Sequence, residues 1–138
     1  MVLTERKLIE RLASQPLFNK TSKRNLKTVA QLGQQTTWAK GKSGVVEGST
    51  AAAFYVILDG AVTVTKDGKQ LARLQDDDFF GEVALLTGGE RTATVTALIE
   101  THLFALSRST FSTLVKTNSA LAMQLMAAMV ERTESPSY

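Results

Sequence analysis

Residues 79–95 read Phe-Phe-Gly-Glu-Val-Ala-Leu-Leu-Thr-Gly-Gly-Glu-Arg-Thr-Ala-Thr-Val. Gly81 has no Cβ, so the backbone can approach a ligand closely at this position. The next residues, 82–86, are good helix formers but too few for more than one or two turns. The start of a short helix leaves its first amide N–H groups unpaired, and these groups, with the local dipole, favour a phosphate. The stretch therefore has the backbone pattern of an anion site.

The second half of the stretch supplies a positive charge. The guanidinium of Arg91 can donate two parallel hydrogen bonds to phosphate oxygens, and small side chains after it leave room for a ligand beside the backbone. An ionised Glu82 only accepts hydrogen bonds, so it fits an anion site if the ligand also carries hydroxyl groups, as a ribose does. Taken singly, each of these residues is also compatible with a structural or solvated role.

The joint pattern is more specific than its parts. Phe80-Gly81-Glu82-Val83-Ala84-Leu85-Leu86, four further residues, and Arg91-Thr92-Ala93-Thr94-Val95 resemble the phosphate-binding cassette of cyclic nucleotide-binding domains. This is the family of the catabolite activator protein, the regulatory subunits of cyclic-AMP-dependent kinase and the cytosolic domains of cyclic-nucleotide-gated channels. The resemblance extends through Gly41, Glu47-Gly48, residues 54–60, Val62 and Val64.

The resemblance implies a binding module without catalysis, whose ligand is cyclic AMP or cyclic GMP and which needs no other cofactor. It implies contacts to that ligand from Gly81, Glu82, Val83, Ala84, Arg91, Thr92, Ala93 and Val64. Backbone N–H groups of Gly81 and Ala84 would bind the cyclic phosphate, Glu82 the ribose 2′-hydroxyl, and Arg91 the phosphate charge.

Two of these residues are expected near the base of the nucleotide. Val64 would line it, and Thr92 would present a hydroxyl to the phosphate or to the base. A threonine at this position occurs in relatives of both preferences, so cyclic GMP stays open beside cyclic AMP, which we favour slightly. The C-terminal helices of the family report occupancy, and the last helix often covers the base.

Composition indicates an ordinary globular domain. The chain has 138 residues, 43% of them hydrophobic, with a mean hydropathy of −0.02. Its longest apolar runs, 51–58 and 120–130, are too short to cross a bilayer. The first residues lack the apolar core of a secretory signal, so we expect a cytoplasmic protein. The absence of cysteine excludes disulfides and thiolate metal sites.

The net charge is +3, and the basic residues are dispersed. Only Lys20, Lys23, Arg24 and Lys27 form a group, which a solvated helix face explains. We therefore expect no direct binding to nucleic acid and an effector that is a protein. The extra domains that accompany this module in the family are absent from these 138 residues, so we expect a free-standing module or a fragment of a longer protein.

The pattern of elements predicts an α+β fold, an antiparallel β-roll or jelly-roll barrel flanked by N-terminal and C-terminal helices. We expect one domain, 1–138, with helices in 1–33, the roll in 34–107 including the cassette at 79–95, helices in 108–133 and a tail at 134–138. Helix starts are expected at Thr4, Thr21-Ser22, Ser107-Arg108-Ser109 and Asn118-Ser119, and Gly33 should end the second helix.

Several side chains are expected on inner faces. Asp67-Gly68 predicts a hairpin turn, and Ala93, Val95, Ala97 and Ile99 alternate as on one face of a strand. In the helix after Ser107, the residues expected inside are Phe111, Leu114 and Val115. The last helix has an apolar stripe at Leu121, Leu125 and Met129, which could be core or the seam of a homodimer.

Two departures from the family pattern leave a second reading open. Glu90 stands where the family commonly has proline, and its charge could compete with a ligand for Arg91. Asp77, within Asp76-Asp77-Asp78, takes a place that usually holds glycine. The alternative is a degenerate domain that keeps the fold as an interaction scaffold and binds no nucleotide.

A jelly-roll metalloenzyme is a more distant alternative. Such an enzyme needs several His or Glu ligands around one metal, and His102 is the only histidine in the sequence. We expect His102 and the acidic run to be structural.

Overall fold

The structure is a computed structural model, and it describes residues 2–50, 53–82 and 90–131. The helical elements in these ranges are α1 (Glu5–Ala13), the 3-10 turn η1 (Pro16–Phe18), α2 (Lys23–Leu32), α4 (Arg108–Thr117) and α5 (Ser119–Glu131). The strands are β1 (Gln34–Trp38), β2 (Ser43–Val45), β3 (Ala53–Asp59), β4 (Ala61–Lys66), β5 (Lys69–Gln75), β6 (Phe79–Phe80), β7 (Thr94–Ala97) and β8 (Thr101–Ser107). None of the helices in the described ranges has the length and hydropathy of a membrane span.

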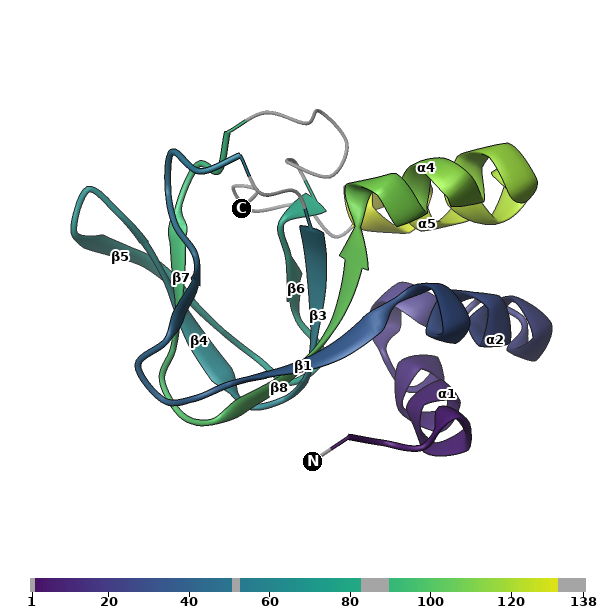
Figure 1. The fold of residues 1–138 in the computed structure, drawn as a ribbon, viewed down its shortest axis with the longest axis horizontal. Helices are drawn as coiled ribbons and strands as arrows, with labels where there is room; N and C mark the ends of the chain where they lie inside the picture. The colour runs from purple at the N-terminus through teal and green to yellow at the C-terminus, as the bar shows by residue number, and fades with distance from the viewer. Residues whose placement is uncertain (1, 51–52, 83–89, 132–138) are drawn as a thin grey trace.

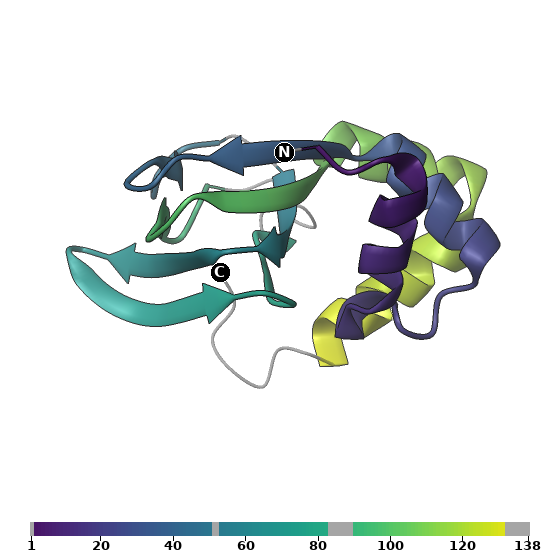
Figure 2. The ribbon, with the colours of Figure 1, turned by 90° about the horizontal axis from the view of Figure 1, so that it is seen from below.

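The strands of the described ranges form two antiparallel four-stranded sheets, in the orders β1-β8-β3-β6 and β2-β7-β4-β5. The sheets face each other as an open β-roll, and the helices pack against one side of it (Figures 1 and 2). The predicted α+β class and the flanking helices are confirmed. The roll is not closed into a barrel, because the two sheets keep separate strand orders.

Strand β3 is buried on both faces. Phe54, Val56 and Leu58 belong to the apolar core beneath the helices, whereas Ile57 belongs to a second core between the sheets. Side chains alternate across a strand, so one strand serves two cores when both of its faces are covered. The molecule therefore has three layers, with the sheet that contains β3 in the middle (Figure 1).

The expected helix starts are confirmed by their caps. Thr4 Oγ1 accepts from the Lys7 amide at 3.3 Å, and Ser107 Oγ accepts from the Thr110 amide at 3.1 Å. The side chains of Ser22 and Asn118 cap α2 and α5 in the same way. Each cap satisfies an amide that the helix itself leaves unpaired.

Some local predictions hold and others are wrong. Asp67 and Gly68 have φ of 51° and 77°, as the predicted Asp-Gly turn requires. Ile99 is 53% exposed because β7 ends at Ala97, so the alternation stops before it. Val115 is 42% exposed because it follows Leu114 by one residue, which turns it about 100° away from the core face.

The residue that follows α2, Gly33, is a glycine for a steric reason. Its φ of −88° is accessible to any residue, so no left-handed cap is involved. A Cβ at this position would lie 2.1 Å from Cζ of Phe104, which is 1% exposed in the helical core. The close approach of the chain to this ring decides the residue.

His102 is half-buried on β8. It lines a cavity of about 320 Å³ together with Arg11, Asp59 and Glu100. Its Nε2 is buried and has no hydrogen-bond partner among the described residues. Burial lowers the pKa of His102, and the carboxylate of Asp59 opposes this shift.

We expect Gly33→Ala to lower the free energy of unfolding by about 1–3 kcal/mol, because Phe104 must move in a packed core. An unhindered Gly→Ala change at such a φ would instead stabilise by about 0.4–1 kcal/mol. Urea denaturation measures the sign, and a stabilised variant would contradict the steric account.

We expect the melting temperature to depend on His102 at mildly acidic pH. The unfolded pKa is about 6.5 and the folded pKa is lower, so the stabilisation is complete above about pH 6.5 and is lost as the pH falls through the folded pKa. His102→Gln should therefore lose less stability than the wild type between about pH 7 and pH 5. The expectation is refuted if the melting temperatures of the two proteins change equally between about pH 7 and pH 5.

Candidate functional site

Arg91 is the buried centre of the site. Its residue is 4% exposed, although arginine is almost never fully buried without partners. Nη2 donates a hydrogen bond to the carbonyl of Ala53 at 2.6 Å, and Nη1 donates to the carbonyl of Gly81 at 3.5 Å. The backbone of Arg91 is fixed as well, because its amide donates to Ser49 and its carbonyl accepts from Gly48. The guanidinium is thus held from several sides.

One nitrogen of the buried guanidinium makes no hydrogen bond within the described ranges. Nε of Arg91 is buried and has no partner in the described part of the chain. Burial lowers the pKa of Arg91, and the Tyr55 hydroxyl group and the Glu82 carboxylate oppose that shift. An unsatisfied buried donor on a cation is costly, so the site is electrostatically suited to an anion.

Gly81 has a structural role that does not depend on a ligand. Its φ is +89°, a region that side chains rarely adopt. A Cβ there would lie 2.7 Å from the Ala53 oxygen and 2.8 Å from Arg91 Nη1. Besides the predicted approach to a ligand, this glycine makes room for the arginine and its carbonyl partner.

Aromatic side chains form a wall next to this centre. Tyr55 stacks on Phe80, with ring centroids 5.2 Å apart, and meets Trp38 edge-on at 5.2 Å. Burial raises the pKa of Tyr55, and the positive charge of Arg91 opposes the shift. Trp38, Tyr55 and Ala53 also line a cavity of about 430 Å³ at the inner face of β1, β3 and β8. This volume is in the range typical of small-molecule pockets.

The structure brings several predicted residues into this region. Glu82 is 5% exposed, and its charge acts on Arg91. Ala93 and Val64 are buried in the core between the sheets, and Thr92 is exposed. Val83 and Ala84, and the helical turn expected at 82–86 beyond its first residue, lie outside the described residues. The contacts expected with a ligand remain predictions for all eight residues.

The two departures from the family pattern, Glu90 and Asp77, make none of the hydrogen bonds described for Arg91. Glu90 is exposed, and the hydrogen bonds described for Arg91 go to the carbonyls of Ala53 and Gly81 instead. Asp77 has a φ of +76°, which fits a glycine-like position, and its carboxylate binds Arg11 on α1.

The other carboxylates of the acidic run have local structural partners. Asp76 Oδ1 accepts from the Gly60 amide at 2.7 Å, and Asp78 Oδ2 accepts from the Gln75 amide at 2.9 Å. Within the described ranges, no group of three or more His, Asp or Glu side chains is placed to hold a metal ion. The run therefore closes its own turn through Asp78 and ties it to Gly60 and to α1.

Sequence reasoning missed two features of the site. The carbonyl of Ala53 holds Arg91, and a backbone acceptor leaves no mark in the sequence. Tyr55 was not among the predicted site residues, although its place between Phe54 and Val56 puts it on the opposite face, inside the roll. Alternation along β3 was the signal that could have identified it.

Comparison with known proteins identifies the family. A family model of the cyclic nucleotide-binding domain matches residues 35–118, which is more than half of the chain. The chain belongs to the cyclic nucleotide-binding domain family, as the cassette predicted.

The relatives include kinase regulatory subunits. The chain is 35% identical over 120 residues to a cAMP-dependent protein kinase regulatory subunit of Debaryomyces hansenii, with 78% of this chain and 26% of that protein covered. It is 29% identical, with a TM-score of 0.70, to the regulatory domain of Toxoplasma gondii PKA solved with cAMP, covering 84% of this chain and 46% of that one.

A further solved structure shares the fold. The regulatory subunit of a cAMP-independent protein kinase A from Trypanosoma brucei has a TM-score of 0.83 at 18% identity, covering 96% of this chain and 46% of that one. At this identity the similarity concerns the fold alone. The chain spans less than half the length of each of these three proteins.

We expect Gly81→Ala to destabilise the protein and to displace Arg91, because the new Cβ meets the Ala53 oxygen and the guanidinium in addition to left-handed strain of about 1–2 kcal/mol. Gly48→Ala is the matched control, since Gly48 has a φ of +82° and nothing lies within 4 Å of its Cβ position. Urea denaturation of both variants measures the difference. Equal losses would show that Gly81 is required for its φ alone.

Proposed function

We propose that the chain is a non-catalytic sensor module that binds cyclic AMP in the β-roll. The observation that carries the proposal is the buried guanidinium of Arg91, whose Nε has no hydrogen-bond partner in the described part of the chain and which lies beside a glycine at positive φ. A cyclic phosphate would supply a negative charge for this cation and a hydrogen-bond acceptor for its Nε. Charge-assisted hydrogen bonds are worth about 1.5–3 kcal/mol, so Arg91 should dominate affinity.

The remaining ligand contacts are those that the resemblance to the family implies. The amides of Gly81 and Ala84 would bind the phosphate, and Glu82, beside the cation, would accept from the ribose 2′-hydroxyl. Thr92 is exposed, so its hydroxyl is available to the phosphate or to the base. Val64 would face the base, with Val83 and Ala93 completing the apolar surroundings.

Two of the relatives favour cyclic AMP. The Debaryomyces hansenii relative is named as a cAMP-dependent regulatory subunit, and the Toxoplasma gondii domain was solved with cAMP. Thr92 keeps cyclic GMP as the second candidate, since its hydroxyl could reach a guanine amino group.

We further propose that α4 and α5 report occupancy to an effector. Ser107 ends β8 and caps α4, and both Ser107 and Thr110 line the cavity beside Tyr55. A ligand with different affinities for two helix arrangements would shift their populations. The basic residues are dispersed, so we expect the effector to be a protein. Unchanged amide exchange in residues 108–131 on adding ligand would contradict this relay.

Calorimetric titration with cyclic AMP and with cyclic GMP tests the binding proposal. We expect micromolar or tighter binding by the wild type, a loss of about tenfold to a hundredfold in Arg91→Ala, and an intermediate loss in Arg91→Lys, which keeps the charge but not the planar fork.

Glu90→Gln is the control, because it changes the neighbouring exposed charge without touching the guanidinium. Melting temperatures of all variants separate lost binding from lost folding. If the folded wild type gives neither heat nor a shift in melting temperature with either nucleotide, the interaction-scaffold reading replaces this proposal.

A further inference from the structure

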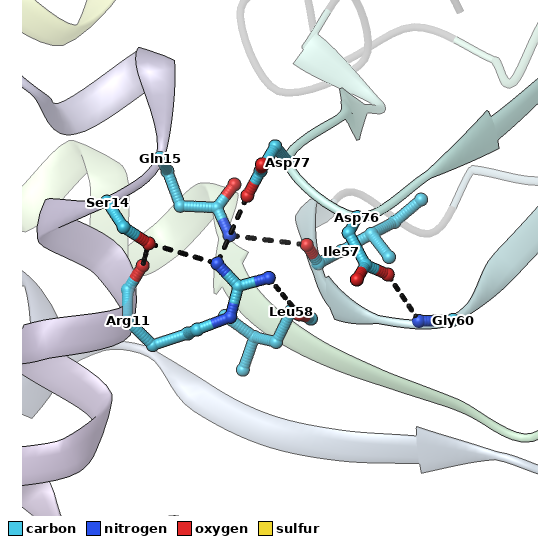
Figure 3. A network of polar contacts seen from close by, with 8 residues as sticks. All are labelled: Arg11, Ser14, Gln15, Ile57, Leu58, Gly60, Asp76 and Asp77. Atoms are coloured by element: carbon cyan, nitrogen blue, oxygen red, sulfur yellow. Dashed lines mark hydrogen bonds and ion pairs between the residues drawn. The ribbon is translucent and has the colours of Figure 1, made fainter.

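A contact between the N-terminal helix and the roll lies just before the cassette. Arg11, in the last turn of α1, donates from Nη1 to Asp77 Oδ1 at 3.1 Å and to Ser14 Oγ at 3.0 Å. Its Nη2 donates to the carbonyl of Leu58 at the end of β3. Figure 3 shows the guanidinium between α1, β3 and the turn of residues 75–78. One side chain thus bridges three parts of the fold.

The turn that Arg11 holds has an unusual backbone. Asp77 has a φ of +76°, a conformation that is uncommon for residues other than glycine and is best tolerated by Asn and Asp. The side chain of Asp77 is 47% exposed and that of Arg11 is 30% exposed, so the pair is half-shielded from solvent. The ion pair therefore stabilises a turn that its own backbone does not favour.

The same turn is tied to β3 by further hydrogen bonds. The Asp77 amide donates to the carbonyl of Ile57 at 3.2 Å, and the Ile57 amide donates to the carbonyl of Asp78 at 2.9 Å. Gln15, which is fully buried directly after α1, donates from Nε2 to the same Ile57 carbonyl at 3.3 Å (Figure 3). The end of α1 and the turn share one acceptor.

The turn leads directly to the site. Four residues after Asp77 stands Gly81, whose carbonyl accepts from Arg91. Between them, Phe79 packs on Phe54 under the helices, and Phe80 stacks on Tyr55 inside the roll. A shift of the turn would move both rings and the Gly81 carbonyl, because the segment is too short to absorb it.

The other end of the connection reaches the C-terminal helix. Segment η1 follows α1 after two residues and packs against α5. Gln124 of α5 donates from Nε2 to the Lys20 carbonyl just after η1, at 3.1 Å. A displacement of α1 therefore has a contiguous path to α5.

We infer that Arg11 is a positioning residue of the nucleotide site, and that through Asp77 it couples occupancy of the cassette to the position of α1. The inference rests on the proposed function for its ligand, while the hold on the turn is a property of the ligand-free protein. Arg11 does not touch the ligand. It fixes residues 75–81 in the arrangement that places Gly81 beside Arg91.

The test uses the full chain with Arg11→Gln, Asp77→Asn and the double variant. Asn tolerates positive φ, so Asp77→Asn removes the charge and leaves the turn conformation accessible. Arg6→Gln is the matched control, because it breaks the Arg6–Glu10 pair on the same helix, where the side chains are 90% and 67% exposed. Arg11→Lys is the conservative variant, which reaches Asp77 but cannot also bridge to Leu58 through a planar fork.

Calorimetry with cyclic AMP and amide exchange of residues 5–15 and 75–82 are measured for each protein. We expect about threefold to tenfold weaker binding in both single variants, no further loss in the double variant, partial retention in Arg11→Lys and wild-type affinity in Arg6→Gln. Ligand should change exchange in residues 5–15 of the wild type and of Arg6→Gln, and this response should be lost in Arg11→Gln.

Two outcomes overturn the inference. If Arg11→Gln lowers the melting temperature but keeps wild-type affinity and the ligand response in residues 5–15, the contact is only structural. If the wild type binds neither nucleotide, the proposed function fails separately, and the hold on the turn is judged without ligand. The inferred role of Arg11 in holding the turn then requires amide exchange of residues 77–81 to be at least threefold faster in Arg11→Gln than in Arg6→Gln. Equal exchange rates in the two variants refute that role.

Discussion

Burial of β3 on both faces is the constraint on which the rest of the structure depends. Phe54, Val56 and Leu58 give the helices an apolar surface, and Tyr55 and Ile57 face the inside of the roll. A strand covered on both sides must hold its neighbours in one register, since a slip of one residue would exchange the two faces. The helical layer and the β-roll are therefore built on a common element.

The backbone of β3 also carries the polar contacts of the site. At its start, the carbonyl of Ala53 holds the guanidinium of Arg91, and near its end the carbonyls of Ile57 and Leu58 hold Gln15 and Arg11. Two arginines of distant sequence position thus rest on the two ends of one strand. This arrangement anchors Arg91 to β3, and it places the N-terminal helix and the cassette within reach of the same strand.

The cassette could be recognised from sequence because its chemistry is local. Gly81, Glu82 and Arg91 lie within eleven residues. Their order alone indicated an anion site with a carboxylate that accepts a hydrogen bond from a ligand hydroxyl. The same reasoning could not place the two carboxylates that it set against Arg91. Glu90 is its neighbour in the chain but is exposed, and the carboxylate of Asp77 is engaged by Arg11 from α1. Proximity in sequence does not give the direction in which a side chain points.

The sequence by itself determined the fold class, the helix caps, the Asp67-Gly68 turn and the family, because each depends on residue types at short, fixed spacings. Only the tertiary structure decided that Gly33 is required by the ring of Phe104, and that Arg91 is held by a backbone carbonyl of β3. Those contacts join segments far apart in the chain, and a carbonyl acceptor is present at every residue. Which one lies within hydrogen-bonding distance is settled by packing alone.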